Sequence, residues 1–522
     1  MSTVPTNTRP SQPSWSHIRL AEPEDFEETY SLLVSYALNP ESALSVERFS
    51  VCTAEWPQPR KRKLGAVDVD SASATQQAFD DTAHGILENR ARSLGLSEDT
   101  TAEMLTALAS KKASLTDPDA ASSDESGDVT RSYCRTAAIL LLSFCIEIAH
   151  LCAGELRDEV FEEYLTKCNY GVVPLTYRAF QNLQTIHIYG GWSWRDDERM
   201  YYSVEYFQYL DYFHRLPKFQ NIVLDGTGEY QMDQTLFPPK SCPSLRSIQM
   251  RHVDVPASVA AVLVRAPQAL ESFTLSLGGL LSIDGGRPMF ELKTFAKALE
   301  TQKDTLRSVD LDIGNTLSAM ASSQWETTGW KEETTGESYG FVDEDDEDDP
   351  DNTDDEDLTP REAMKKALGH DLPHDLPDTR EYGYTIGSLH DFHRLTHLSI
   401  NLRALVGPVD SDDPTSKLTK PPPKRLIDAL PSSLEYLCFY GYGKGTNEEV
   451  DELVDELLEK NSERLPKLLR VDGVDEMIEG EGTQYGDDPD EDELWESNYV
   501  NEGWTEKVGE TDEDEEGEED SG

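Results

Sequence analysis

Basic residues are scarce in this chain of 522 residues, which contains 46 Lys and Arg against 101 Asp and Glu and has a formal net charge of −55. Because nucleic-acid phosphates are bound mainly by Lys and Arg, this balance disfavours direct nucleic-acid binding and favours basic protein partners. The acidic charge is uneven. Residues 343–357 contain 12 acidic residues and no basic one, and residues 475–522 contain 22 acidic residues and one Lys.

Cysteines are also few. There are seven, an odd number, and no two are arranged as a CxxC pair. This usage excludes a disulfide framework and is typical of a reducing compartment. Residues 1–15 are polar and proline-rich, without the apolar core of a signal peptide. We therefore expect an intracellular protein, cytoplasmic and/or nuclear.

Long hydrophobic runs are missing. The most apolar stretch, residues 137–153, is interrupted by Glu147 and His150 and is shorter than the ~20 residues of a membrane-spanning helix. It predicts a buried helix that leads into a strand, and no membrane association.

Catalytic motifs are absent as well. The sequence contains no HExxH, no GxSxG and no Cys/His nucleophile context. Carboxylates in acidic runs lack the desolvation that tunes a general acid or base. Five of the eleven histidines gather in residues 370–397, but no Cys lies near them and a zinc site needs four convergent ligands. They are His370, His374, His390, His393 and His397. We predict no enzyme activity, no cofactor and no metal.

The glycine-rich phrase YGYGKGTN at residues 440–447 precedes an expected helix. Its spacing differs from that of a phosphate-binding loop, and Glu448 and Glu449 would oppose an anion there. A turn in which Thr446 or Asn447 caps the helix explains the phrase.

One pattern recurs along the chain, apolar-x-x-apolar-x-apolar. It occurs as LQTIHI (183–188), FQNIVL (219–224), LRSIQM (245–250), LESFTL (270–275), LRSVDL (306–311), LTHLSI (395–400) and LEYLCF (434–439). Weaker copies start at Val46 and Ile148. The last two apolar positions of each copy alternate as in a strand buried on one face. The second apolar residues of the seven full copies should form one buried column: Ile186, Ile222, Ile248, Phe273, Val309, Leu398 and Leu437.

Helical segments lie between the copies, at residues 204–215, 257–265, 290–299, 424–430 and 448–460. Strand and helix thus alternate with a period of about 25–40 residues. Sequential strands joined by helices should pair in parallel, with the helices on the outer side of the sheet.

In these repeats the chain resembles leucine-rich-repeat proteins. LHDFHRLTHLSINLRAL, LIDALPSSLEYLCFYGYG, SLLVSYALNPESALSVERFSV and LLLSFCIEIAHL resemble the divergent repeats of fungal F-box and leucine-rich-repeat proteins. The resemblance covers roughly residues 16–472 and implies an α/β fold, a leucine-rich-repeat solenoid with a curved parallel sheet and outer helices. An F-box is not found in the sequence.

The organisation we expect starts with a disordered N-terminus at 1–15 and a helical, irregular repeat region at 16–170, with flexible loops at 55–80 and 111–130. Leucine-rich repeats follow at 171–325 and 386–472. Two acidic segments, an insertion at 326–385 and a tail at 473–522, cannot bury enough apolar area to offset the entropy of ordering and should be disordered.

The residues between the buried strand positions point to the opposite, concave face. Interfaces draw most of their energy from a few Tyr, Trp and Arg side chains. We therefore predict Tyr189, Arg251, Tyr436 and Tyr440 as anchors for a protein partner, with Asp310 and Asp312 setting charge specificity. The side chains of Tyr189, Arg251, Asp310 and Tyr440 should bury little, so their substitution should leave the melting temperature nearly unchanged. The main hypothesis is a non-catalytic interaction scaffold.

Two other functions stay open. One is a nuclear acidic chaperone that binds basic proteins such as histones. The tail, with Trp495, Tyr499, Val500 and Trp504 among acids, and the basic run at residues 60–63, which resembles a nuclear import signal, are consistent with it. The other is the substrate-recognition part of an F-box-type ubiquitin ligase, which would need an F-box missing from this chain. The partner's identity and the oligomeric state are not predictable.

Overall fold

The structure is a computed structural model of the chain. It describes residues 16–20, 23–26, 29–53, 79–116, 127–154, 156–189, 201–229, 237–279, 290, 292–314, 385–409, 417–418, 422 and 424–480. The described residues fall into two compact units, the first within 1–188 and 215–219 and the second within 189–214 and 220–480.

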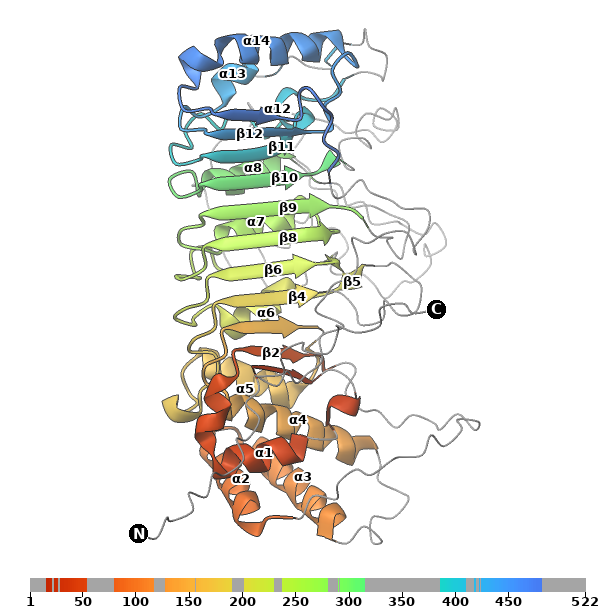
Figure 1. The fold of residues 1–522 in the computed structure, drawn as a ribbon, viewed down its shortest axis with the longest axis vertical. Coiled ribbons are helices and arrows are strands. Elements are labelled where there is room, and N and C mark those ends of the chain that lie inside the picture. Colours follow the sequence, from red (N-terminus) through yellow and green to blue (C-terminus); the bar gives the residue numbers. More distant parts are fainter. Residues whose placement is uncertain are drawn as a thin grey trace, which may run out of the picture. The chain divides into compact units, whose positions relative to one another are not determined.

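Eleven strands form an open parallel sheet, and their order in the sheet follows their order in the chain (Figure 1). They are β1 (His17–Leu20), β2 (Arg48–Val51), β3 (His150–Ala153), β4 (Thr185–Tyr189), β6 (Asn221–Asp225), β8 (Ser247–Val253), β9 (Ser272–Leu277), β10 (Ser308–Asp312), β11 (His397–Asn401), β12 (Tyr436–Tyr440) and β13 (Arg470–Asp472). Two further strands, β5 (Tyr202–Ser203) and β7 (Thr227–Gly228), pair with each other. The predicted α/β class with parallel strands is confirmed.

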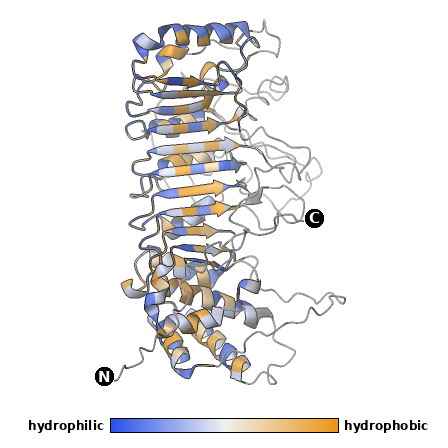
Figure 2. Cartoon of the chain, viewed as in Figure 1, coloured by the Kyte–Doolittle hydropathy of each residue, from blue (hydrophilic) through white to orange (hydrophobic). Residues whose placement is uncertain are grey.

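The repeated apolar positions align across the strands. Phe273 of β9 is paired with Ile248 on one side and Val309 on the other, and Leu398 of β11 lies between Val309 and Leu437. All seven residues of the predicted column are at most 1 % exposed. Figure 2 shows the resulting alternation of hydrophobic and hydrophilic bands along the strands. Burial of each such side chain contributes roughly 1.5–3 kcal/mol, so the column is a main source of the sheet's stability.

The first unit has long helices, α1 (Thr29–Leu38), α2 (Asp81–Ser93), α3 (Glu98–Thr116), α4 (Gly127–Phe144) and α5 (Glu159–Asn169), and short 3-10 helices at Pro23–Phe26, Pro40–Ser45 and Leu175–Tyr177. The apolar stretch at 137–153 forms the end of α4 and then β3, as predicted. In the described part of the chain, none of the helices combines the length and the hydrophobicity that a bilayer crossing requires.

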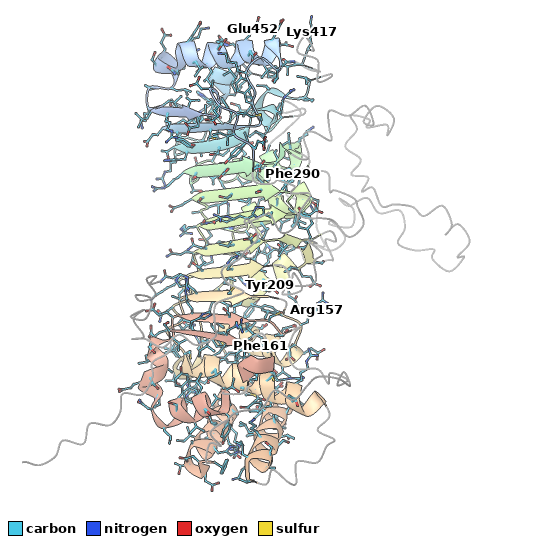
Figure 3. The ribbon with its side chains drawn as sticks, turned by 45° about the vertical axis from the view of Figure 1, so that its right-hand side comes forward. Arg157, Phe161, Tyr209, Phe290, Lys417 and Glu452 are labelled. Carbon is cyan, nitrogen blue, oxygen red and sulfur yellow. The ribbon has the colours of Figure 1, made fainter. Side chains whose placement is uncertain are left out.

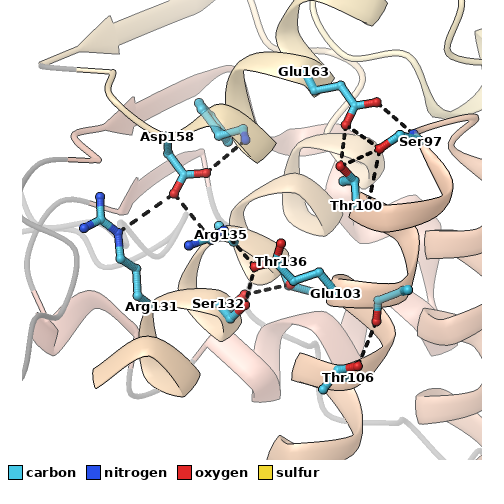
Figure 4. Close-up of polar contacts among 12 residues, drawn as sticks. Ser97, Thr100, Glu103, Thr106, Arg131, Ser132, Arg135, Thr136, Asp158 and Glu163 are labelled. Atoms are coloured by element: carbon cyan, nitrogen blue, oxygen red, sulfur yellow. Dashed lines mark hydrogen bonds and ion pairs between the residues drawn. The ribbon is translucent and has the colours of Figure 1, made fainter. Parts of the chain in front are cut away.

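Polar contacts, most of them partly buried, join α3, α4 and α5 (Figure 4). Arg135 of α4 donates to Glu103 of α3 at 2.7 Å, and its Nε lies 3.4 Å from Asp158, whose other oxygen caps the first turn of α5 by accepting from the Phe161 N–H. Glu163 of α5 accepts from the Ser97 N–H and the Thr100 hydroxyl at the start of α3. These contacts fix the mutual positions of three helices by specific charged groups.

The flexible loop predicted at residues 111–130 is too long at both ends. Helix α3 continues to Thr116, and α4 already begins at Gly127. Helix α3 continues through Lys111 and Lys112. The Lys111 ammonium lies 4.9 Å from the Tyr133 ring, and that of Lys112 lies 2.8 Å from Asp81. The predicted disorder at 1–15, most of 55–80, 326–384 and 481–522 lies outside the described residues, as does the basic run at 60–63.

The helices of the second unit are α6 (Tyr206–Phe213), α7 (Ala257–Arg265), α8 (Leu292–Glu300), α12 (Arg403–Val406), α13 (Leu426–Ala429) and α14 (Glu448–Arg464). Each matches a predicted helix except α12. Asn447 caps α14, since its Oδ1 accepts from the Val450 N–H at 3.1 Å, as predicted for the turn at 440–447. Val450, Val454 and Leu457 are buried, whereas Glu452 lies on the outer side of α14 (Figure 3).

The disordered tail was predicted to begin at residue 473, which is too early. Residues 473–480 are ordered on the last strands: Val474 is buried, and the Gly441 N–H donates to the Ile478 carbonyl at 2.9 Å. Gly473 has φ +76°, and a Cβ there would collide with the carbonyl of Phe439, so only glycine lets the chain turn back.

Candidate functional site

The last four strands present aligned rows of side chains on the face opposite the buried column. One row runs Ser308, His397, Tyr436 and Arg470, and the next runs Asp310, Ser399, Cys438 and Asp472. In the third row Asn401 is paired with Tyr440. We call these rows on β10–β13 the C-terminal face. Three of the six predicted site residues, Asp310, Tyr436 and Tyr440, meet there.

Tyr436 is held between its neighbours in the row. Its hydroxyl donates to Asp472 Oδ2 at 3.0 Å. The Arg470 guanidinium binds the same carboxylate through Nε at 2.9 Å and Nη2 at 2.8 Å, and its Cζ lies 5.8 Å from the Tyr436 ring centre. The His397 ring lies 6.0 Å away on the other side. Asp472 thus fixes both the phenol and the guanidinium.

The ionisation of these groups keeps the arrangement intact at neutral pH. The hydrogen bond from Arg470 lowers the pKa of Asp472, which stays a carboxylate. Burial, followed by the hydrogen bond to Asp472, raises the pKa of Tyr436, which stays a donor. Burial also raises the pKa of the neighbouring Cys438 thiol, so this cysteine is a poor nucleophile.

Tyr440 is anchored across a strand. Its hydroxyl donates to Asp310 Oδ1 at 3.0 Å, so a side chain of β12 reaches over β11 to β10. Burial and the nearby Asp310 raise the pKa of Tyr440, which is half-buried rather than freely exposed. The expectation that this side chain buries little was therefore wrong.

Asp312 does not belong to the accessible surface. Asp312 is only 4 % exposed, and the backbone of Gly480 lies directly against its carboxylate. The Gly314 N–H is 3.4 Å from Oδ1 on the other side. Asp312 was predicted to set charge specificity, but a buried carboxylate cannot contact a partner. It organises the chain around it instead.

Arg251 and Tyr189 lie apart from this cluster. Arg251 is exposed on β8, paired with Asp225 of β6, and four strands from β12. That separation is roughly 19 Å at the usual strand spacing. Tyr189 is the last residue of β4, and its side chain lies outside the described part. The predicted site is thus one cluster and two separate positions.

Arg470 and Asp472 were missed because their strand was missed. In β13 the third apolar position of the repeat is occupied by Gly473, which hides the pattern. Leu468 and Val471 do fit the first two apolar positions, and that partial match was the available signal.

Across the described ranges, no group of three or more His, Cys, Asp or Glu is placed to hold a metal ion. His390 and His393 lie in an exposed turn before β11, and His370 and His374 are outside the described residues. All seven cysteines are buried, and none forms a disulfide. No model of a known protein family matches the chain, and no curated protein matches it.

Proposed function

We propose that this chain is an irregular leucine-rich-repeat solenoid that acts as a non-catalytic scaffold and binds a protein partner on the C-terminal face. The parallel sheet, whose strands follow chain order and bury one repeated column, supports the fold assignment. The pre-positioned pair Tyr436 and Tyr440 supports the binding role.

Pre-positioning matters because a bound side chain loses rotamer freedom. Immobilising a flexible side chain costs about 0.5–1.5 kcal/mol on binding. Tyr436 and Tyr440 are already held by Asp472 and Asp310 in the free protein, so most of that cost is removed. Rigid tyrosines flanked by an arginine and carboxylates are typical of the residues that dominate binding energy.

The test starts from a partner captured with the intact chain and measures its affinity by calorimetry. Changing Tyr436 and Tyr440 together to Ala should weaken binding by at least about tenfold, because hot-spot residues contribute ~2 kcal/mol or more each. Leu44→Ala is the matched control, since Leu44 is 44 % exposed but lies on a short helix away from the sheet face. Equal affinities for the double variant and the control would refute the assignment of the site.

A second function, binding of basic proteins, is favoured by the surroundings of Asp312. Gly314 and Gly480 both lie against the carboxylate of Asp312. The segments that follow, 315–384 and 481–522, contain 21 and 19 acidic residues. Their starting points coincide, so a basic partner could meet both.

Salt dependence separates the two functions. Binding through the acidic segments should weaken steeply as NaCl rises from about 50 to 300 mM, because long-range attraction is screened. Binding through the tyrosines should change little over the same range. If the partner dissociates at high salt and its affinity is unchanged by the tyrosine substitutions, the second function is supported and the first is not.

A further inference from the structure

The first unit carries a compact apolar patch on a loop. Only eight large hydrophobic residues are more than about a third exposed in the described part, and three of them lie within six residues between α5 and the 3-10 helix at Leu175–Tyr177. They are Tyr170 (45 %), Val172 (55 %) and Leu175 (67 %), and we call them the loop patch. Grouped exposed hydrophobic residues indicate an interaction site far more strongly than single ones do.

The loop that carries the patch is held firmly. The Arg178 guanidinium donates to the carbonyls of Gly171 at 2.7 Å and Val173 at 2.9 Å. The Val172 N–H donates back to the Lys167 carbonyl at 2.9 Å, and the Arg215 guanidinium lies 4.4 Å above the Tyr170 ring. The exposure of the three side chains is therefore a built feature of the loop and not fraying.

The stretch of sequence that carries the patch lacks the acidic residues that dominate the chain. Residues 164–195 are the longest run without Asp or Glu in this acidic sequence. Lys167 is paired with Glu163, but Arg178 donates to carbonyls and, within the described residues, is paired with no carboxylate. With Arg215 at its edge, the patch combines apolar side chains with positive charge.

A segment of the same chain has the complementary chemistry. Residues 491–504, EDELWESNYVNEGW, carry Leu494, Trp495, Tyr499, Val500 and Trp504 among five acidic residues and no basic one. We propose that this segment docks on the loop patch of its own chain. Its aromatic side chains would cover Tyr170, Val172 and Leu175, and its carboxylates would lie near Arg178 and Arg215.

Covalent linkage makes such docking possible without high intrinsic affinity. A tethered segment reaches an effective concentration in the millimolar range where its linker spans the two sites, and weak contacts then suffice to populate the docked state. A weak contact is also readily displaced by a partner with a similar acidic and aromatic segment. The inference is independent of the function proposed for the C-terminal face.

Disulfide trapping in the intact chain tests the docking. Thr176→Cys places a thiol on the exposed loop beside the patch, and Ser497→Cys places one within the segment without removing an apolar residue. The seven natural cysteines are buried and should not compete. Under mild oxidation this pair should form an intramolecular disulfide at least about tenfold faster than the control pair of Ser462→Cys on α14 with Ser497→Cys.

A second variant tests the role of the patch itself. Adding Val172→Ser and Leu175→Ser to the trapping pair should reduce the rate to that of the control, while circular dichroism stays unchanged because both side chains are exposed. Equal trapping rates for the loop pair and the control pair would overturn the proposal. So would disulfides that form only between two chains, or trapping that persists after the patch is removed.

Discussion

The two units of the molecule are stabilised in different ways. In the first unit an apolar core is supplemented by charged groups that join α3, α4 and α5, with the partly buried Arg135 and the buried Asp158 at the centre. In the second, strands and short helices pack through repeated apolar positions that are almost completely buried. A buried charge requires one particular partner, whereas an apolar column accepts residues of similar size. The charged contacts of the first unit and the apolar column should therefore differ in how well they tolerate amino-acid substitutions.

The largest expected effect comes from breaking the apolar column. Leu437→Ala should lower the free energy of unfolding by ~2–5 kcal/mol, because Leu437 is fully buried and the cavity cannot collapse between β11 and β13. Chemical denaturation measures the loss. Leu469→Ala is the control, since Leu469 is 85 % exposed in the same unit, and it should change stability by less than about 0.5 kcal/mol.

Breaking the charged network in the first unit should cost about 3 kcal/mol. Asp158→Ala removes the cap of α5 and leaves Arg135 with one buried carboxylate fewer. Asp158→Asn keeps an oxygen that accepts from the Phe161 N–H, so it should lower the free energy of unfolding by less. If both variants unfold at the same denaturant concentration as the wild type, specific charge pairing does not stabilise this unit.

A buried carboxylate in the second unit provides a test by pH. Glu229 accepts from the Tyr206 N–H at 3.0 Å at the start of α6, and burial raises its pKa from 4.5 to about 8. The folded state then keeps a proton that the unfolded state releases between these pH values, so this contribution to stability is lost as pH rises through about 8. Glu229→Gln should match the wild type near pH 4.5 and exceed its stability by roughly 2 kcal/mol at pH 8.5. A constant difference in melting temperature across that range would contradict the raised pKa.

The smallest effect is expected on the C-terminal face. Tyr440→Phe removes the hydrogen bond to Asp310 but keeps the ring, and it should cost ~1 kcal/mol or less. Thermal denaturation is sensitive enough to detect it. A much larger loss would mean that Tyr440 is mainly a structural residue.

The sequence predicted the sheet well because the evidence for it is repeated. The column from Ile186 to Leu437 was identified residue by residue, since a one-residue shift of register would expose every member. Strands β1 and β13 were both missed, for different reasons. In β13 Gly473 occupies the third apolar position. Before and within β1, Trp15, Ile18 and Leu20 do complete the pattern, so the sequence contained the signal for this strand.

The site was predicted only in part, because it depends on contacts between strands distant in sequence. The exposed positions of β12 followed from alternation alone, so Tyr436 and Tyr440 were found. Nothing local indicates that Tyr440 would reach Asp310, 130 residues away, or that Gly480 would cover Asp312. The extent of α3 was also not predictable, because the partners of Lys111 and Lys112 lie on other helices.

The order of strands in the sheet has a consequence for how the chain accommodates inserted sequence. Each strand from β9 to β12 is paired with the strand before it and the strand after it in the chain. Residues 313–396 separate β10 from β11, yet Ser308 is still aligned with His397 and Val309 with Leu398. Residues 52–149 likewise separate β2 from β3 without changing their alignment. New material can thus enter a gene of this kind at the junctions between repeats, and each repeat already in place keeps its neighbours.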